Sequence, residues 1–241
     1  MNSLRVALGF LTVLPVRSPV ALAPGELSRA AGWFPAVGLL LGGLLALTAT
    51  AARGLFPPYL EGALVVVLWT LLTGALHLDG LSDCCDALFV PASRARRLEI
   101  LRDPRIGSFG AAGLACFLLL KTAAVAALPG PWPLLVAPAI GRWSVLLTAV
   151  HPNARTQGLG VGFSEGLDRR LLAAAAATAA LAAGACGWRG LLAFVASQAG
   201  VLGLVWLARR RLGGVTGDVI GATCEVSELL VLLAFAAAGV A

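Results

Sequence analysis

The sequence predicts an all-α protein that crosses a membrane several times as a helical bundle. Apolar residues make up 59% of the 241 residues and charged residues only 12%, about half the ~25% charge of a soluble domain. Mean hydropathy is +0.90. A soluble fold of this size leaves about a quarter to a third of its surface wet and could not hide so much apolar area. Composition therefore excludes a soluble globular domain, a disordered chain, a fibrous repeat and a disulfide scaffold.

The chain opens with an apolar run from Val6 to Val16, followed by Ala21-Leu22-Ala23, which is similar to a signal peptide with its cleavage site. Pro15 and Arg17 interrupt this pattern, and the rest of the chain is already typical of a membrane protein. We therefore expect a short interfacial or re-entrant helix there.

Seven further apolar runs have about the length that a bilayer crossing requires. They are Phe34–Thr50, Leu60–Gly80, Gly110–Leu128, Pro133–Val150, Leu171–Cys186, Leu191–Ala208 and Val219–Ala241. We expect about seven transmembrane helices that form a single membrane-embedded domain over residues 1–241.

Basic residues predict a cytoplasmic N-terminus, because cytoplasmic loops collect Lys and Arg. With that orientation, fourteen arginines lie on the cytoplasmic side and only Arg53 and Arg189 lie on the other. This asymmetry accounts for most of the net charge of +6 without nucleic acid as a partner. The five cysteines are odd in number, and most lie in or beside apolar runs, so we expect free thiols and no disulfide framework.

The first group of residues that could carry chemistry is His77-Leu78-Asp79-Gly80-Leu81-Ser82-Asp83-Cys84-Cys85-Asp86. Asp79, Asp83 and Asp86 stand at i, i+4 and i+7 and share one helix face. Three aligned carboxylates repel one another unless a cation lies among them, and Mg²⁺ binds through carboxylates and substrate phosphates. His77, one turn earlier, is expected either to hydrogen-bond an acid or substrate or to be a buried structural histidine.

The second group runs from Gly213 to Asp218 and continues to Glu225 and Glu228. Glycines before a helix start, including Gly217, offer bare N–H groups to phosphate. Asp218 is expected to be either a ligand or a helix cap. Glu225 and Glu228 lie inside an apolar span, where ionisable residues usually mark function.

Basic residues accompany both acidic groups. Lys121 and Arg142 lie within spans and are expected to hold phosphate, neutralise the acids or pair structurally. Arg102 and Arg105 suit phosphate oxygens. The glycine-rich loop from Ala154 to Asp168 is either a lid over a bulky substrate or a plain linker. These features together favour Mg²⁺-assisted phosphoryl transfer at a membrane-embedded site that faces the cytoplasm.

The segment from His77 to Asp86 resembles the HLDGLxDxxDG signature of the cobalamin synthase (adenosylcobinamide-GDP ribazoletransferase) family. Matching segments run in order through almost the whole chain: Phe10 to Val16, Phe34-Pro35 with Gly38, Glu99 to Gly110, Gly158-Leu159-Gly160, and Gly217-Asp218-x-x-Gly221-Ala222 with Glu225 and Glu228. The signature is specific, and the other segments are individually weaker. Ala87 stands where the family usually has Gly.

The resemblance implies a transferase that joins adenosylcobinamide-GDP to α-ribazole or its 5′-phosphate and releases GMP. It also implies Mg²⁺ as the metal, the bacterial inner membrane as the location and lipid as the surroundings; a homo-oligomer stays open. The hypothesis assigns metal ligation to Asp79, Asp83, Asp86, Asp218 and Glu225. Asp86, Asp83 and His77 would be catalytic, with Asp86 the favoured base, and Arg102, Arg105, Lys121 and Gly217 would bind phosphate.

Two other classes remain open on the sequence. One is a membrane phosphotransferase of lipid synthesis similar to CDP-alcohol phosphotransferases, although the longer acidic pattern of that family is missing. The other is an ion-coupled transporter, in which buried acids would serve as relay or coordination sites.

Overall fold

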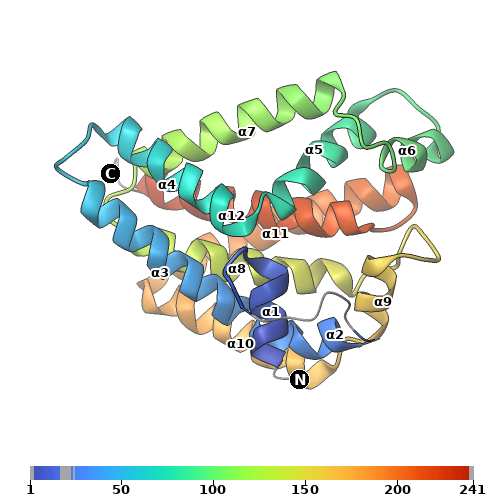
Figure 1. The fold of residues 1–241 in the computed structure, drawn as a ribbon, viewed down its shortest axis with the longest axis horizontal. Coiled ribbons are helices and arrows are strands. Elements are labelled where there is room, and N and C mark those ends of the chain that lie inside the picture. The colour runs from blue at the N-terminus through green and yellow to red at the C-terminus, as the bar shows by residue number, and fades with distance from the viewer. Residues whose placement is uncertain (1–2, 17–22, 24, 239–241) are drawn as a thin grey trace.

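The computed structural model describes residues 3–16, 23 and 25–238, which contain no β-strand and only two isolated bridges. The elements are α1 (Ser3–Leu11), α2 (Glu26–Ala30), the 3-10 helix η1 (Ala31–Trp33), α3 (Phe34–Ala52), α4 (Pro58–Thr73), α5 (Leu76–Phe89), α6 (Arg94–Ile100), α7 (Ser108–Ala126), α8 (Trp132–Ala149), α9 (Leu159–Glu165), α10 (Arg169–Ala185), α11 (Gly187–Leu212) and α12 (Gly217–Ala238). The all-α prediction is therefore confirmed (Figure 1).

Each of the seven predicted spans coincides with a helix or a helix pair. Within the described residues, five helical stretches are long and apolar enough to cross a membrane, and the bent pair α4–α5 makes a sixth if it counts as one span. α10 has 17 residues and is not among the five. The chain is thus a helical membrane protein, whereas seven crossings and a cytoplasmic N-terminus stay predictions.

The second span differs from the prediction of one continuous helix over Leu60–Gly80. α4 ends at Thr73, and α5 leaves it at an angle of 97°. Gly74 and Ala75 both have left-handed backbone conformations, with φ of 59° and 58°. The backbone N–H of Val13 donates to the carbonyl of Leu72 over 2.9 Å, which satisfies a group that the break releases. The acidic residues therefore belong to a separate helix.

The short helix predicted near the N-terminus is present as α1, which buries Val6, Ala7 and Leu11. Most of the segment similar to a cleavage site, Ala21 and Leu22, lies outside the described residues. The five cysteines are free thiols, as predicted.

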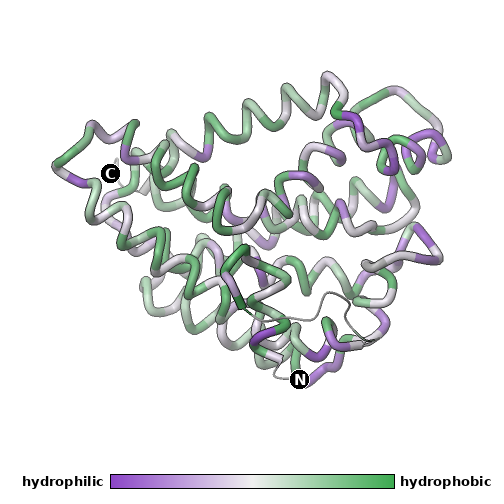
Figure 2. Tube along the Cα trace, viewed as in Figure 1, coloured by the Kyte–Doolittle hydropathy of each residue, from purple (hydrophilic) through white to green (hydrophobic). Residues whose placement is uncertain are grey.

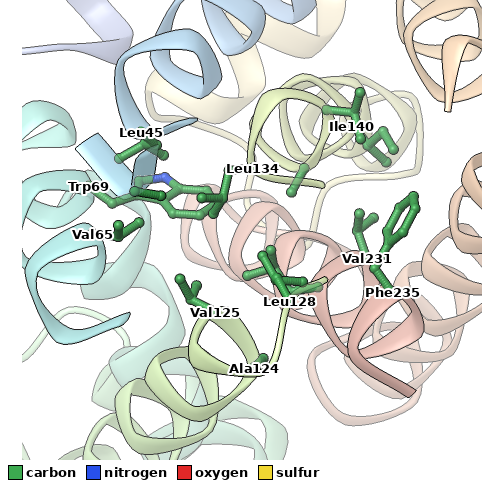
Figure 3. Close-up of a cluster of buried hydrophobic side chains, with 14 of the residues drawn as sticks. Leu45, Val65, Trp69, Ala124, Val125, Leu128, Leu134, Ile140, Val231 and Phe235 are labelled. Carbon is green, nitrogen blue, oxygen red and sulfur yellow. The ribbon is translucent and has the colours of Figure 1, made fainter. Parts of the chain in front are cut away.

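α12 is the central helix, because it supplies side chains to all three buried apolar clusters. In the first cluster, Val231 and Phe235 of α12 lie with Leu134 and Trp69 (Figure 3). The second joins α12 to α1, α3 and α8, and the third joins it to α5, α7 and α11. The position of α12 therefore fixes where its N-terminal end meets α5.

α3 and α8 pack backbone to backbone through Gly38 and Gly42, four residues apart. A Cβ on Gly38 would lie 2.5 Å from the Cα of Ala139, and a Cβ on Gly42 would overlap the carbonyl of Leu135. Small residues at this spacing are a usual means of close helix packing in membranes. Hydrophilic residues gather at the end of the bundle that contains α5, α6 and α9 (Figure 2), and the candidate site lies at that end.

Candidate active site

α5 carries the predicted acidic stripe. Asp79, Asp83 and Asp86 all lie within this one helix, so their spacing does place them on one face. Asp79 is exposed, and Asp83 is partly buried. In the part of the chain that the structure describes, the carboxylates of Asp79 and Asp83 have no hydrogen bond or ion pair. Both are free to bind a ligand.

Two glycines allow α5 to approach the start of α12. A Cβ on Gly80 would lie 2.6 Å from the backbone oxygen of Asp218, and one on Gly221 would lie 3.6 Å from the Cα of His77. A side chain at position 80 would push the helices apart. The close approach brings the carboxylate of Asp218 within electrostatic reach of Asp83, which also experiences the charges of Asp79 and Asp86.

Asp218 is held by groups on both sides of it. The Thr216 hydroxyl donates to its Oδ2 over 3.1 Å, and Arg155 Nη2 lies 3.7 Å from the same oxygen. Arg155 is placed by a short backbone pairing, in which Ala154 donates to the carbonyl of Val215 over 2.8 Å. Asp218 is thus a partly buried acid with one cation beside it. The Thr216 hydroxyl oxygen also accepts from the backbone N–H of Val219 in the first turn of α12.

A cavity of about 320 Å³ opens beside these residues. Its lining comes from segments far apart in the sequence, namely Phe10, Leu27, Leu76, His77, Asp79, Gly80, Val145, Asn153, Arg155, Gln157, Gly158, Gly160, Val161, Phe163, Val215, Thr216, Gly217, Asp218, Ile220 and Gly221. The predicted site residues His77, Asp79, Gly217 and Asp218 therefore meet at one place. Gly217 begins α12, so the phosphate-binding helix start that the sequence predicted faces this cavity.

His77 is buried in the wall of this cavity, with 4% of its surface exposed. Its Nδ1 atom is buried and has no hydrogen-bond partner. An unpaired buried polar atom costs free energy, about 1–3 kcal/mol. The described protein therefore leaves Nδ1 of His77 without a hydrogen bond. The position of His77 in the cavity wall favours contact with a bound ligand.

Asp86 has a structural task that the sequence did not indicate. Its two oxygens accept from the backbone N–H groups of Gly107 and Gly110, each over 2.8 Å. A Cβ on either glycine would overlap the Asp86 carboxylate. Asp86 thus fixes the start of α7 against α5 and satisfies N–H groups that a helix start leaves unpaired. This makes it a weaker candidate for the base than the sequence suggested.

A second hollow of about 480 Å³ lies on the other side of the stripe and is lined by Asp83, Asp86, Asp103 and Arg105, among others. Arg105 donates to both oxygens of Asp103, over 2.9 and 2.8 Å. These hydrogen bonds lower the pKa of Asp103 to about 2, so this exposed pair stays ionised at neutral pH. Arg102 is exposed and lines neither this hollow nor the first cavity.

Lys121 and Glu225 belong to a different group, buried between α7, α8 and α12. Lys121 Nζ lies 2.7 Å from Glu225 Oε2 and 2.8 Å from Glu228 Oε2. Arg142 donates to the other oxygen of Glu228. All four side chains are at most 4% exposed. The two cations and two anions neutralise one another, and none of them lines the cavity or the hollow beside the aspartates.

The donor set at the end of α5 fits a magnesium ion. Within the described residues, no group of three or more His, Cys, Asp or Glu side chains is arranged to enclose a metal. Mg²⁺ does not require such a cage, because it commonly binds through one or two carboxylates and completes its shell with water and substrate phosphates. Asp79, Asp83 and Asp218 offer carboxylates, and among the described residues the ion pair that any of the three makes is that of Asp218 with Arg155 at 3.7 Å, so a bound cation would offset their repulsion.

Sequence reasoning missed Arg155, Phe10 and Phe163 as residues of the cavity. The sequence placed Arg155 among the fourteen cytoplasmic arginines and within the loop from Ala154 to Asp168, without a role of its own. Its place just before Gly158 and Gly160 was the available signal, since both glycines also line the cavity. Phe163 lies in the loop that was interpreted as a lid or a linker; the structure forms α9 there and buries Phe163 to 6% exposure.

Comparisons with known proteins give matches to one family over nearly the whole chain. The family model described as cobalamin-5-phosphate synthase matches residues 3–236. A protein of Pseudomonas paraeruginosa (strain DSM 24068 / PA7) named adenosylcobinamide-GDP ribazoletransferase is 43% identical, with 98% of each chain covered. A relative of the same name from Desulfitobacterium hafniense (strain Y51) is 37% identical, covering 97% of this chain and 96% of the relative. No solved structure matches.

The fold and the site define a helical membrane protein with a ligand cavity and an acidic stripe at one end of its bundle. A third relative with that name, from Roseiflexus sp. (strain RS-1), is 41% identical over 94% of this chain and 86% of the relative. The chain belongs to the cobalamin-5-phosphate synthase family.

Proposed function

We propose that this protein transfers the phosphocobinamide part of adenosylcobinamide-GDP to α-ribazole or its 5′-phosphate and releases GMP. The observation that carries the proposal is the family match over residues 3–236, together with relatives that are named for this activity and cover nearly the whole chain. The products are adenosylcobalamin or its 5′-phosphate. The geometry supports it, because a cavity and a second hollow flank one row of carboxylates.

In this proposal, Asp79 and Asp218 would hold Mg²⁺ beside the cavity that both of them line. When bound, the ion would neutralise charge on the pyrophosphate of the donor and on the departing GMP. Arg155, next to Asp218, adds a fixed positive charge for a phosphate oxygen. Glu225 and Lys121 are not part of this assignment, because they pair with each other in the buried group.

Asp83 is the carboxylate that we assign to accept the proton of the ribazole hydroxyl. It has no hydrogen bond of its own in the described structure, and it lies between the acids of the cavity and the second hollow. Asp86 is less suited, since both of its oxygens already accept from backbone N–H groups. The open second hollow, with Arg105 at its edge, is the side from which the bulky donor would approach.

The test is an assay of the detergent-purified protein with adenosylcobinamide-GDP, α-ribazole 5′-phosphate and Mg²⁺, in which GMP and the corrinoid product are both measured. We expect product, its loss with EDTA and its return with added Mg²⁺. Asp83→Asn should lower kcat at least about 100-fold, the scale of general base catalysis. Asp168→Asn is the matched control, because Asp168 caps α10 and asparagine caps equally well.

Absence of product from folded wild-type protein would refute the transferase proposal. Full activity of Asp83→Asn would refute the role of Asp83 alone, and activity that survives EDTA would refute the role of Mg²⁺.

We also infer that the protein lies in the bacterial inner membrane with the acidic end in the cytoplasm. The fourteen-to-two distribution of arginines supports this orientation. Reporter fusions after Thr73, at the end of α4, and after Ala149, at the end of α8, would test it. The proposed orientation predicts that both fusions report the cytoplasm, and a report from the other side of the membrane by either would contradict it.

A further inference from the structure

The cavity of about 320 Å³ has a polar side and an apolar side. Asp79, Arg155, Thr216 and Asp218 line the first, together with Asn153 and Gln157. The second consists of Phe10, Leu27, Val145, Val161, Phe163 and Ile220. Most of these apolar residues belong to the buried cluster between α1, α2, α3, α8 and α12. A ligand suited to this cavity is therefore small, with an apolar part and a polar part.

The apolar side is built on a row of stacked rings. Phe34 stacks on Phe163 with centroids 5.7 Å apart, and on Phe10 with centroids 6.1 Å apart. Phe10 and Phe163 line the cavity, whereas Phe34, which stacks on both, does not. Rings held in this way are suited to contact the face or edge of another aromatic ring.

We propose that this cavity is the binding site of the ribazole substrate, with its dimethylbenzimidazole base against the apolar side and its ribose toward the acids. This inference rests on the proposed function. The base is flat, carries two methyl groups and has one free ring nitrogen as its only hydrogen-bonding atom. The cavity volume is at the small end of the roughly 300–1,000 Å³ of ligand pockets, which suits a nucleoside and excludes a corrinoid.

The guanosine of the donor fits the apolar side less well. Guanine presents the O6 and N7 acceptors and an N2 amino group. Against Phe163, Val145 and Ile220 those groups would lose their hydrogen bonds with water and gain none, which is costly. The donor is therefore assigned to the hollow beside Asp83 and Arg105, whose lining includes charged side chains.

The unpaired atom of His77 agrees with this placement. Nδ1 of His77 is buried in the cavity wall without a partner. In the tautomer with its proton on Nδ1, the imidazole donates one hydrogen bond, and the free nitrogen of the benzimidazole accepts one. The hydroxyl and phosphate groups of the ribose then lie on the side of Asp79 and Asp218, the acids whose charges Asp83 experiences.

Equilibrium binding by titration calorimetry tests the site without turnover. We would measure the Kd of α-ribazole 5′-phosphate for the detergent-purified protein, and the Kd of the analogue that lacks both methyl groups. Burial of two methyl groups predicts about 15-fold tighter binding of the methylated compound. Phe163→Leu should weaken its binding about 2- to 12-fold. Phe235→Leu, the same change in the first buried cluster and away from the cavity lining, should leave the Kd within about 2-fold of wild type.

The outcomes separate this inference from the proposed function. Equal affinity for the methylated and unmethylated compounds in wild-type protein would overturn the site, and this arm does not depend on any variant folding. The site would also be overturned if Phe163→Leu raised the KM for adenosylcobinamide-GDP and not the KM for the ribazole substrate. In that case the proposed transferase activity would still stand. Discriminating binding without product formation would support the site while refuting the transferase reaction.

Discussion

The buried charges at Lys121 and Glu225 permit a sharp test of what these two residues do. Lys121→Met would leave Glu225 without a cation, since Glu228 alone keeps Arg142. Breaking a buried pair from one side costs about 3–5 kcal/mol. At about 2–4 °C per kcal/mol for a chain of this size, the Tm should fall by about 6–20 °C. Glu225→Gln should cost less, about 1.5–3 kcal/mol, because Lys121 keeps Glu228.

The double variant Lys121→Met/Glu225→Gln restores neutrality and leaves the pair of Arg142 and Glu228 intact. We expect its Tm to lie above that of Lys121→Met and within about 6 °C of wild type, since a neutral replacement of a buried pair is often well tolerated. Thermal unfolding in detergent, followed by tryptophan fluorescence, is a suitable assay because Trp69 lies beneath Lys121, 3.9 Å from Nζ to the ring centroid.

The exposed pair of Arg96 and Glu99, with side chains more than 60% exposed, supplies the control cycle. Its coupling should be at most about 0.5 kcal/mol. A double variant at 121 and 225 whose destabilisation is the sum of the two single values would refute the pairing argument. A double variant that is folded but inactive would instead support the sequence-based assignment of Glu225 to the metal site.

Three further changes test the geometry around the acidic stripe. Gly80→Ala should lower the Tm by about 2–12 °C and reduce activity, because its methyl group would lie 2.6 Å from the Asp218 carbonyl oxygen; an unchanged Tm would contradict this close contact. Asp86→Ala should destabilise the protein by about 0.5–2 kcal/mol through the loss of two hydrogen bonds at the start of α7, as measured by thermal unfolding, whereas a purely catalytic role predicts no change in Tm. Ala75→Gly should leave the Tm unchanged or raise it by up to about 4 °C, because φ at this position is 58°, and Ala75→Val should lower it; the reverse order would show that α4 and α5 are not joined by this left-handed turn.

Local patterns in the sequence predicted local features correctly. The apolar runs gave the positions of the helices, and the spacing of Asp79, Asp83 and Asp86 gave their common face, because both depend only on helix geometry. The break at Gly74 and Ala75 was missed, since both residues are common within apolar spans and neither reveals its φ in the sequence. One glycine in an apolar run does not distinguish a turn from a packing contact.

Contacts between distant segments were the part that sequence could not supply. Lys121 and Glu225 are 104 positions apart, and Asp86 is 21 positions from Gly107. Glu225 was interpreted as a metal ligand because an acid inside an apolar span is usually functional, and Asp86 because it shares a helix face with Asp79 and Asp83. Both have protein partners that only the packing of α7 against α5 and α12 reveals.

The acids of this chain divide according to whether the protein already neutralises them. Inside the bundle, Glu225 and Glu228 each contact a cation, as they must where an unpaired charge is costly. This self-contained pairing also disfavours the transporter hypothesis, in which buried acids would be open to an ion. At the end of the bundle, Asp79 and Asp83 have no such partner among the described residues, and Asp218 has Arg155 at 3.7 Å. An excess of negative charge persists there because water can reach it, and it is this excess that a divalent cation and a phosphate-bearing substrate can use. Charge balance, more than the presence of an acid in an apolar segment, therefore distinguishes the acids that hold the bundle together from those that are free to act on a substrate.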